Sequence, residues 1–307
     1  MTLEEAINQA CSRVGILPPQ GRIDMRRWIK SNTTGKNGKG DGRLICDDFR
    51  VTAHNWQTGE SITVWLNEQR TPEEKRRFAK QRQEDDRKAR ERSDNAAAIA
   101  QRIVRVAHAD QHAYLARKGF PDERPLVLDA RTIAEIGGRY LAPEGGGDAI
   151  VVPARIGERI SSVQLIWESG AKKFLFGGDM SGAAHRIATG GATWLCEGFA
   201  TGLSLRAALR GLNRRDTVLV CFSASNIVKV AALVKGRRYV AADHDAPPAA
   251  NPDQFGGLGA GEFFAQKTGG PYLMPPVQGT DINDMHQAEG IFAVQRLISS
   301  LLRGVPM

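Results

Sequence analysis

The chain has few cysteines for its 307 residues: four, at positions 11, 46, 196 and 221, with no CxxC pair among them. A zinc ribbon uses two such pairs, so the sequence excludes a ribbon in this chain. The pattern GxxxxGKS or GxxxxGKT is also missing, which excludes a P-loop. No apolar run is long enough to span a bilayer, and the first ten residues, MTLEEAINQA, are acidic and unlike a signal peptide. We therefore expect no membrane association and a location in the reducing cytoplasm.

The rest of the composition is that of a soluble globular protein, but its positive charge is concentrated in one segment. Hydrophobic residues make up 41% and charged residues 25% of a chain that is long enough for two domains. The net charge is +8, and residues 70–118 hold 14 Lys and Arg against 8 Asp and Glu. A basic stripe of this kind is typical of a surface that binds a phosphate backbone. A solvated helix gives the same pattern, and the sequence leaves both interpretations open.

The basic segment contains a predicted long helix over residues 71–105. Its first half has almost no apolar positions, whereas an apolar face begins at Ala96. This change is typical of a helix that is solvated at first and then packs on a core. We assign residues 70–107 to a helical linker.

A small α+β module is predicted for residues 1–69. Apolar residues recur at helical spacing over residues 1–15, and short β runs follow between Leu44 and Trp65. Trp56 lies between two of these runs, where its ring either stacks on a base of single-stranded DNA or packs in the core of the module.

The second half of the chain alternates apolar strands with helices, and two of the strands end on acids. Thr193–Cys196 is followed by Glu197. Tyr239–Ala242 is followed by Asp243, with Asp245 two residues further on. Between them lies a third apolar strand with a helical run on either side: Thr217–Phe222, Ser204–Leu209 and Asn226–Val234. The alternation predicts a parallel sheet covered on both faces, and ligands of such sheets lie at the carboxyl ends of the strands.

The spacing of the acids fits a divalent cation. In an extended strand Asp243 and Asp245 point to the same side. Two adjacent carboxylates repel each other unless a cation lies between them, and Mg²⁺ takes a few carboxylates together with water and substrate phosphates. Glu197 on a neighbouring strand completes an acidic triad that suits phosphoryl transfer.

Six motifs follow one another along the chain: HAYLARKG at residues 112–119, IVVPAR at 150–155, KKFLFGG at 172–178, CEG at 196–198, AADHD at 241–245 and GTDINDMH at 279–286. Together they resemble the Toprim domain, and more closely the Toprim primases of phages and plasmids, over roughly residues 108–300. The sequence departs from that family at His244, where these proteins often have a third acid. The two outer carboxylates, Asp243 and Asp245, are intact, so metal binding is still expected. The change at His244 is expected to alter only the details of the metal site, such as its affinity.

The resemblance implies an α/β fold in which a Toprim domain, a Rossmann-like parallel sheet with flanking helices, follows a β-rich subdomain, the long helix and the small module. The β-rich N-terminal subdomain of the primase core takes residues 108–190, and we expect only strands and turns over 119–190. The Toprim catalytic domain takes residues 191–307. It ends in one helix, expected over Gln287–Leu302.

The resemblance also implies the acidic site residues. Glu197, Asp243 and Asp245 would be catalytic and would bind the metal, Mg²⁺ or Mn²⁺. Asp281 would be a further metal position. Asp284 either faces the metals as well or caps the final helix.

Cationic residues would bind nucleotide phosphates or DNA. The resemblance assigns this role to Lys172, Lys173, Arg186, Arg117 and Lys118. For the two lysines the alternative is a hairpin turn over residues 168–171 flanked by solvated side chains, and the resemblance favours the binding role.

The leading hypothesis is a DNA primase that synthesises primers from nucleoside triphosphates on single-stranded DNA, in replication of the phage or plasmid type. Without a P-loop in the chain, a replicative helicase would be a separate partner. A Toprim nuclease would use the same acids for cleavage. A non-catalytic nucleic-acid-binding accessory protein of replication is a third possibility, against which the intact acidic triad argues. The sequence argues against a topoisomerase, because no large domain with a catalytic tyrosine is present and the chain has only four tyrosines.

Overall fold

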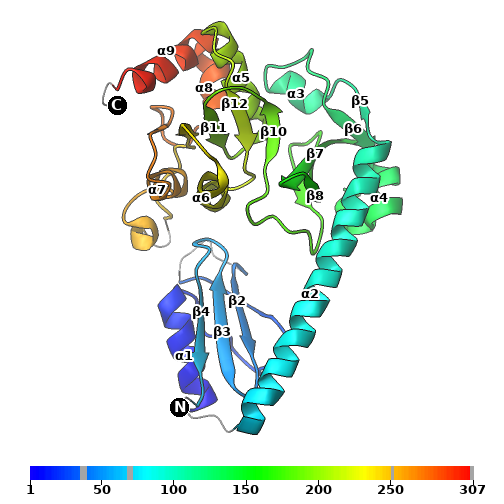
Figure 1. Cartoon of the computed structure of the whole chain (residues 1–307), viewed down its shortest axis with the longest axis vertical. Helices are drawn as coiled ribbons and strands as arrows, with labels where there is room; N and C mark the ends of the chain where they lie inside the picture. The colour runs from blue at the N-terminus through cyan, green and yellow to red at the C-terminus, as the bar shows by residue number, and fades with distance from the viewer. Residues whose placement is uncertain (35–39, 68–71, 250–251, 305–307) are drawn as a thin grey trace. The chain divides into compact units, whose positions relative to one another are not determined.

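The computed structural model of the protein describes residues 1–34, 40–67, 72–249 and 252–304 (Figure 1). The chain divides into two compact units. The first consists of Met1–Arg82 and Asp245–Phe263, and the second of Gln83–His244 and Phe264–Met307.

The first unit contains an antiparallel sheet that a helix covers on one face (Figure 1). The helix α1 (Leu3–Val14) begins at a capping box made by Thr2 and Glu5, and it ends at Gly15, whose φ of 67° is left-handed. The strands, in spatial order, are β1 (Ile29–Ser31), β2 (Gly42–Cys46), β3 (Arg50–Asn55) and β4 (Ser61–Trp65). Alternate residues of β2 and β3 are buried against α1, so the helix and the β runs expected for this segment are present.

Two helices cross the division between the units. The helix α2 (Pro72–Val106) corresponds to the helix predicted for residues 71–105, of which residue 71 lies outside the described residues. Its side chains are buried on one face from Ala96 onward, and Ala100 and Ile103 join a core of the second unit, as the sequence predicts. The other helix is α7 (Ala260–Lys267), preceded by the 3₁₀ turn η2 (Pro252–Phe255).

An antiparallel sheet of five strands forms the first part of the second unit. In spatial order the strands are β5 (His108–Ala109), β6 (Leu126–Asp129), β7 (Asp148–Ile156), β8 (Arg159–Trp167) and β9 (Lys172–Phe174). The helix α3 (Ala113–Arg117) lies between β5 and β6 in the chain. Residues 168–171 form the predicted hairpin turn, in which Trp167 N donates to Ala171 O at 2.9 Å.

The expectation of strands and turns alone over 119–190 is wrong, because a helix lies between β6 and β7. The helix α4 (Ala130–Gly137) is capped by Asp129, whose Oδ1 accepts from Thr132 N at 2.9 Å, and it buries Ile133 in the core. A 3₁₀ turn, η1 (Arg139–Leu141), follows it. With only 8 residues, α4 is too short to show a clear helical period in the sequence.

The predicted parallel sheet forms the second part of this unit. In spatial order its strands are β10 (His185–Ala188), β12 (Thr217–Val220), β11 (Thr193–Cys196), β13 (Arg238–Ala241) and β14 (Tyr272–Leu273). All are parallel except the edge strand β10, which is antiparallel to β12. The chain passes from β11 through α5 (Phe199–Gly211) to β12, then through α6 (Ala224–Leu233) to β13 on the other side of β11. The strand order therefore reverses at β11, and such a switch point is where ligands of these sheets bind.

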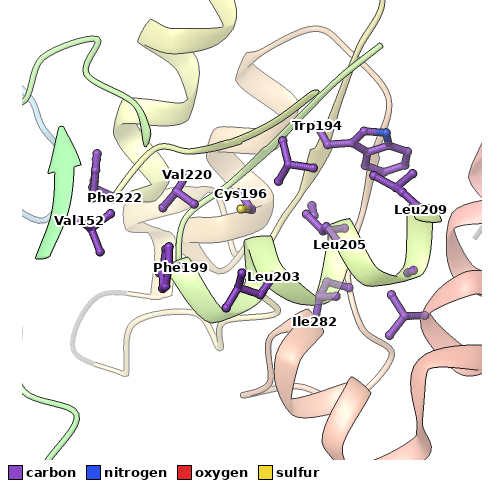
Figure 2. Packing of buried hydrophobic residues seen from close by; sticks show 14 of the residues in the cluster. Val152, Trp194, Cys196, Phe199, Leu203, Leu205, Leu209, Val220, Phe222 and Ile282 are labelled. Atoms are coloured by element: carbon purple, nitrogen blue, oxygen red, sulfur yellow. The ribbon is translucent and has the colours of Figure 1, made fainter. Parts of the chain in front are cut away.

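Both faces of the parallel sheet are covered. Trp194 and Cys196 of β11 face a large core with α5, α8 (Ile282–Glu289) and α9 (Ile291–Leu302), part of which Figure 2 shows. Leu195, between them, faces a smaller core with α6 and α7. The mixed α/β fold with a doubly covered parallel sheet is thereby confirmed, and Cys196 of β11 and Cys221, directly after β12, are buried free thiols.

The single final helix expected over Gln287–Leu302 is wrong, because two helices occupy this part of the chain. Between α8 and α9 lies Gly290, with φ of 82° and ψ of 167°. Only glycine adopts this conformation readily, and an α-helix cannot continue through it. No helix within the described ranges combines the length and the apolar character that crossing a membrane requires.

Candidate active site at the carboxyl edge of the parallel sheet

Two carboxylates lie at adjacent strand ends, beside the switch point of the parallel sheet. Cys196 pairs with Ala241 in the register of β11 and β13, so the two strands end at the same level. Glu197 follows Cys196 directly, and Asp243 follows Ala241 by two residues. Both acids are half-buried, and Oδ1 of Asp243 is shielded from solvent. The register therefore brings Glu197 and Asp243 to one edge of the sheet.

A third carboxylate comes to this edge from the loop before α8. His244 N donates to Thr280 O at 3.0 Å, and Gly279 N donates to His244 O at 2.6 Å, so the loop runs beside the end of β13. Asp281 is the N-cap of α8: its Oδ1 accepts from Asp284 N at 2.9 Å, and Asp284 Oδ2 accepts from Asp281 N at 3.1 Å. Both aspartates thus have a structural role in a capping box, and a metal role for either stays a prediction.

The negative charge of these acids affects the pKa of the buried Cys196 thiol. Burial raises the pKa of Cys196 well above its ordinary value, and the neighbouring Cys221 raises it further. The negative charges of Asp243, Asp281 and Glu197 add to this pKa shift. The three carboxylates therefore lie within electrostatic range of one buried atom, and the thiol stays neutral.

The acids suit a hard divalent cation such as Mg²⁺ or Mn²⁺, but they do not form a closed cage. In the described part of the chain, no group of three or more His, Cys, Asp or Glu side chains is placed to hold a metal ion. Mg²⁺ is usually held by one or two carboxylates plus water and substrate phosphates. Glu197 and Asp243 fit that mode, whereas the larger ligand set with Asp245 and Asp281 stays a prediction.

Asp245 belongs to the first unit and is exposed. Its Oδ2 accepts a hydrogen bond of 2.9 Å from Gly261 N in the first turn of α7, whose positive end stabilises the charge. A Cβ atom at Gly259 would collide with the backbone carbonyl of Asp245. The segment that follows Asp245 therefore fixes its position.

A basic pocket of about 510 Å³ brings three of the predicted cationic residues together. It is lined by Tyr114, Arg117, Lys118, Ser169, Gly170, Lys172 and Gln287. Arg117 and Lys118 lie at the end of α3, and Lys172 begins β9. The Arg117 guanidinium donates to the carbonyl of Glu168, which ties it to the turn between β8 and β9. A pocket with three cations suits a ligand rich in phosphate.

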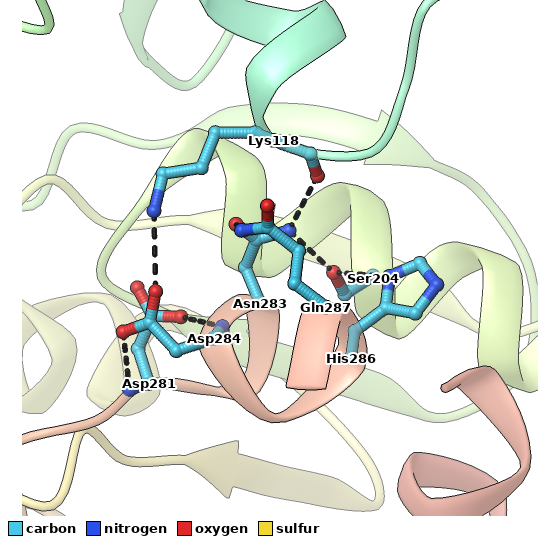
Figure 3. Close-up of polar contacts among 7 residues, drawn as sticks. All are labelled: Lys118, Ser204, Asp281, Asn283, Asp284, His286 and Gln287. Carbon is cyan, nitrogen blue, oxygen red and sulfur yellow. Dashed lines mark hydrogen bonds and ion pairs between the residues drawn. The ribbon is translucent and has the colours of Figure 1, made fainter. Parts of the chain in front are cut away.

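Lys118 connects this pocket to the cap of α8 (Figure 3). Its Nζ lies 3.2 Å from Asp284 Oδ1 in a partly shielded ion pair. Burial alone would lower the pKa of Lys118, but the hydrogen bond and charge of Asp284, together with the charge of Asp281, outweigh it and raise the pKa. Lys118 therefore stays protonated at the loop that carries Asp281.

A buried amide, missed in the sequence, holds the backbone of Lys118 (Figure 3). Asn283 is 0% exposed, and its Nδ2 donates to Lys118 O at 2.9 Å and to Ser204 Oγ at 3.1 Å. Its Oδ1 accepts from Gln287 Nε2 at 3.0 Å. Ser204 Oγ also lies 3.1 Å from His286 Nδ1. The only sequence signal was an asparagine within the GTDINDMH motif, and burial could not be inferred from it.

The other predicted binding residues lie apart from the basic pocket. Lys173 donates from Nζ to Tyr140 O at 2.7 Å. Arg186 is exposed on β10 and lines a separate pocket of about 200 Å³. Trp56, in the first unit, is 63% exposed with its ring edge-on to His54, so it is not a core residue of that module. Binding roles for all three stay predictions.

A strained residue that no sequence signal marks lies at the same edge. Phe222 follows β12 with φ of 70°, a left-handed conformation that bulky residues rarely adopt. Its N–H donates to Glu197 O at 3.0 Å, and its ring packs edge-on against Phe174. The backbone that carries Glu197 is therefore tied to local strain, which is typical of functional sites.

Comparison with known proteins assigns this part of the chain to a domain class. Residues 192–291 match the family model of the Toprim domain, and this segment includes both acidic strand ends and the loop before α8. The chain is also similar to a chain in a solved structure of the bacteriophage T7 lagging-strand DNA polymerase interacting with primase domains of two gp4 subunits bound to an RNA/DNA hybrid and dTTP. There the identity is 15% and the TM-score 0.36, and the match covers 52% of this chain and 79% of that one. At this score the likeness adds nothing to the assignment, which rests on the Toprim segment.

Proposed function

We propose that the protein is a DNA primase, which joins nucleoside triphosphates into short primers on a single-stranded DNA template. The placement of Glu197 and Asp243 on adjacent strand ends within the Toprim segment supports metal-dependent phosphoryl transfer. The resemblance of the flanking motifs HAYLARKG and KKFLFGG to those of Toprim primases favours priming over cleavage. A pair of carboxylates there fits Mg²⁺ or Mn²⁺, which would neutralise triphosphate charge and lower the pKa of the attacking hydroxyl.

The acids at this edge would have different roles in binding the cation and in proton transfer. Asp243, and Asp245 two residues further along the chain, would hold the cation. Glu197 would serve as a further ligand or accept the proton of the attacking 3′-hydroxyl. Asp281 would keep the loop before α8 in place through its cap and add negative charge beside the cation.

The cationic residues would hold the phosphates. Phosphoryl transfer depends mainly on positioning and on stabilisation of negative charge, so cations are needed beside the acids. Arg117, Lys118 and Lys172 line one pocket, and Lys118 pairs with Asp284 in the first turn of α8, the helix that Asp281 caps. This arrangement favours a triphosphate as the ligand.

Template binding would extend beyond this pocket. Lys173, Arg186 and the exposed ring of Trp56 would contact single-stranded DNA, and the basic segment over residues 70–118 would add attraction for the phosphate backbone. A replicative helicase would be a separate protein.

The test is de novo synthesis on an unprimed single-stranded DNA circle, with labelled nucleotides and Mg²⁺ or Mn²⁺. Asp243→Ala and Glu197→Ala are each expected to reduce short products at least about a hundredfold, because each would remove a ligand of the cation that offsets the charge of the reacting phosphate. Glu289→Ala, which removes an exposed carboxylate at the end of α8, is the matched control and is expected to keep wild-type synthesis.

The same reactions separate the rival functions. Metal-dependent loss of the circle without products would identify a Toprim nuclease, which uses the same acids. Retention of DNA with neither synthesis nor cleavage would identify an accessory binding protein. Synthesis that persists in both acidic variants would overturn the assignment of the site.

A further inference from the structure

The two edges of the parallel sheet carry opposite charge. The acids described above lie at the carboxyl edge. Arginines lie at the amino edge: Arg214 and Arg215 precede β12, and Arg237 precedes β13. The parallel strands β11, β12 and β13 have 4 residues each, which separates the edges by about 10 Å. A ligand at the amino edge therefore occupies a different site.

A pocket of about 400 Å³ opens on the amino edge, between the end of α5 and the end of β10. Four arginines line it: Arg206, Arg210, Arg214 and Arg215. The first two are four residues apart on α5 and share one face of the helix. Asp216 and Thr189 also line the pocket. Its volume is in the range that small phosphorylated ligands occupy.

Two of these arginines are held in place by acids. Arg206 makes two hydrogen bonds with the Glu123 carboxylate, at 2.5 and 3.2 Å. Arg214 Nε donates to Asp216 Oδ2 at 2.9 Å, and the same oxygen accepts from Trp194 Nε1 at 3.0 Å. These two ion pairs fix side chains that line the pocket. In each pair the carboxylate offsets most of the positive charge of its arginine.

The other two arginines supply the charge of the pocket. Arg210 and Arg215 are exposed, and in the described ranges of the chain neither has a carboxylate within ion-pair distance. The Arg215 carbonyl accepts from Gly191 N at 2.8 Å, so the backbone beneath its side chain is fixed. Two guanidinium groups without an acidic partner that line one pocket suit a phosphate, since a guanidinium can bind it through two parallel hydrogen bonds.

We propose that this arginine pocket binds phosphate groups, at a site separate from the acidic edge. The phosphates come either from the backbone of a nucleic-acid strand or from a free nucleotide. Binding there requires no divalent cation, since the guanidinium groups themselves neutralise the phosphate. The site is therefore independent of the primase chemistry.

The test compares the full chain with Arg210→Ala/Arg215→Ala, in EDTA, using fluorescence anisotropy of labelled oligo(dT). We expect binding to weaken about tenfold at low salt, and the slope of log affinity against log salt to fall by about 1.4, at about 0.7 per phosphate contact on a single strand. Arg131→Ala/Arg139→Ala removes the same charge from two exposed residues outside the pocket. This control is expected to change affinity less than about twofold, because distant surface charges are screened.

A second arm titrates a fluorescent nucleoside triphosphate, also in EDTA. Loss of oligo(dT) binding would assign the pocket to a nucleic-acid backbone. Loss of triphosphate binding alone would assign it to a free nucleotide, and both results support a phosphate pocket. If both probes bind Arg210→Ala/Arg215→Ala as they bind the control variant, with circular dichroism showing both folded, the proposal is overturned. Neither arm involves synthesis, so a failure of the proposed primase activity would leave these results unchanged.

Discussion

Replacement of the buried Asn283 is expected to destabilise the second unit, mainly because the carbonyl oxygen of Lys118 loses its hydrogen-bond donor. The Asn283 amide donates to Lys118 O and to Ser204 Oγ and accepts from Gln287, all at 2.9 to 3.1 Å. In Asn283→Ala, Ser204 keeps its contact with His286 and exposed Gln287 turns to water. Lys118 O is therefore the group that loses its partner.

The expected loss in the free energy of unfolding follows from these contacts. A polar group left unsatisfied inside a protein costs about 1–3 kcal/mol, and the lost bond to Ser204 adds about 1 kcal/mol. We expect Asn283→Ala to lower the free energy of unfolding by about 2–4 kcal/mol. Asn283→Asp keeps the shape but turns the amide donor into an acceptor that faces Lys118 O. Its cost is expected to exceed that of alanine, because a charge is then buried against a carbonyl.

The assay is urea unfolding followed by circular dichroism. Gln287→Ala is the matched control, since it removes one bond of the same network at an exposed residue, and a change within about 0.5 kcal/mol is expected. An Asn283→Ala protein within about 0.5 kcal/mol of wild type, or an Asn283→Asp protein no less stable than the alanine variant, would refute the reasoning.

Three further predictions follow from single contacts. Burial lowers the pKa of His185 from 6.5 to about 4, so below pH 6.5 the unfolded chain takes up a proton that the folded chain does not. Between pH 7 and 5 wild type should lose about 2 kcal/mol of stability relative to His185→Gln in urea titrations, and a difference that does not vary with pH would contradict this. Lys118→Met should raise the KM for nucleoside triphosphate at least about tenfold while Lys118→Arg retains most affinity, and equal KM values in steady-state assays would rule this out. A Cβ atom at Gly190 would collide with the carbonyl of Arg215, so Gly190→Ala should lose about 1–3 kcal/mol in thermal unfolding, whereas Gly145→Ala, with open space around it, should not.

The strands that carry the acids could be predicted because they are buried on both faces. Such strands appear in a sequence as short continuous apolar runs, and Thr193–Cys196 was predicted with the bounds that β11 has. The acids that follow interrupt these runs abruptly. Glu197 and Asp243 were therefore identifiable from local sequence, and the parallel register then places them together.

Other features depend on contacts between distant segments, which local sequence does not encode. The convergence of Lys118 and Lys172 in one pocket requires the end of α3 to meet the start of β9. The burial of Asn283 depends on α5 and on the end of α3 covering it. Gly290 separates two helices because of its backbone angles, although an apolar face continues on its far side. In each case the sequence shows the residue type, but it does not show which distant residues the side chain or backbone contacts in the fold.

Two departures from local preferences lie at the carboxyl edge of the parallel sheet in the second unit. A bulky residue, Phe222, has a left-handed backbone there, and three carboxylates lie within electrostatic range of the buried thiol of Cys196. A buried polar network around Asn283 adjoins them. The left-handed backbone of Phe222 and the clustered carboxylates each cost stability, and a fold keeps such costs where function requires them. The backbone strain at Phe222 therefore lies at the same edge as the acids of the Toprim motifs, and it is observed independently of those motifs.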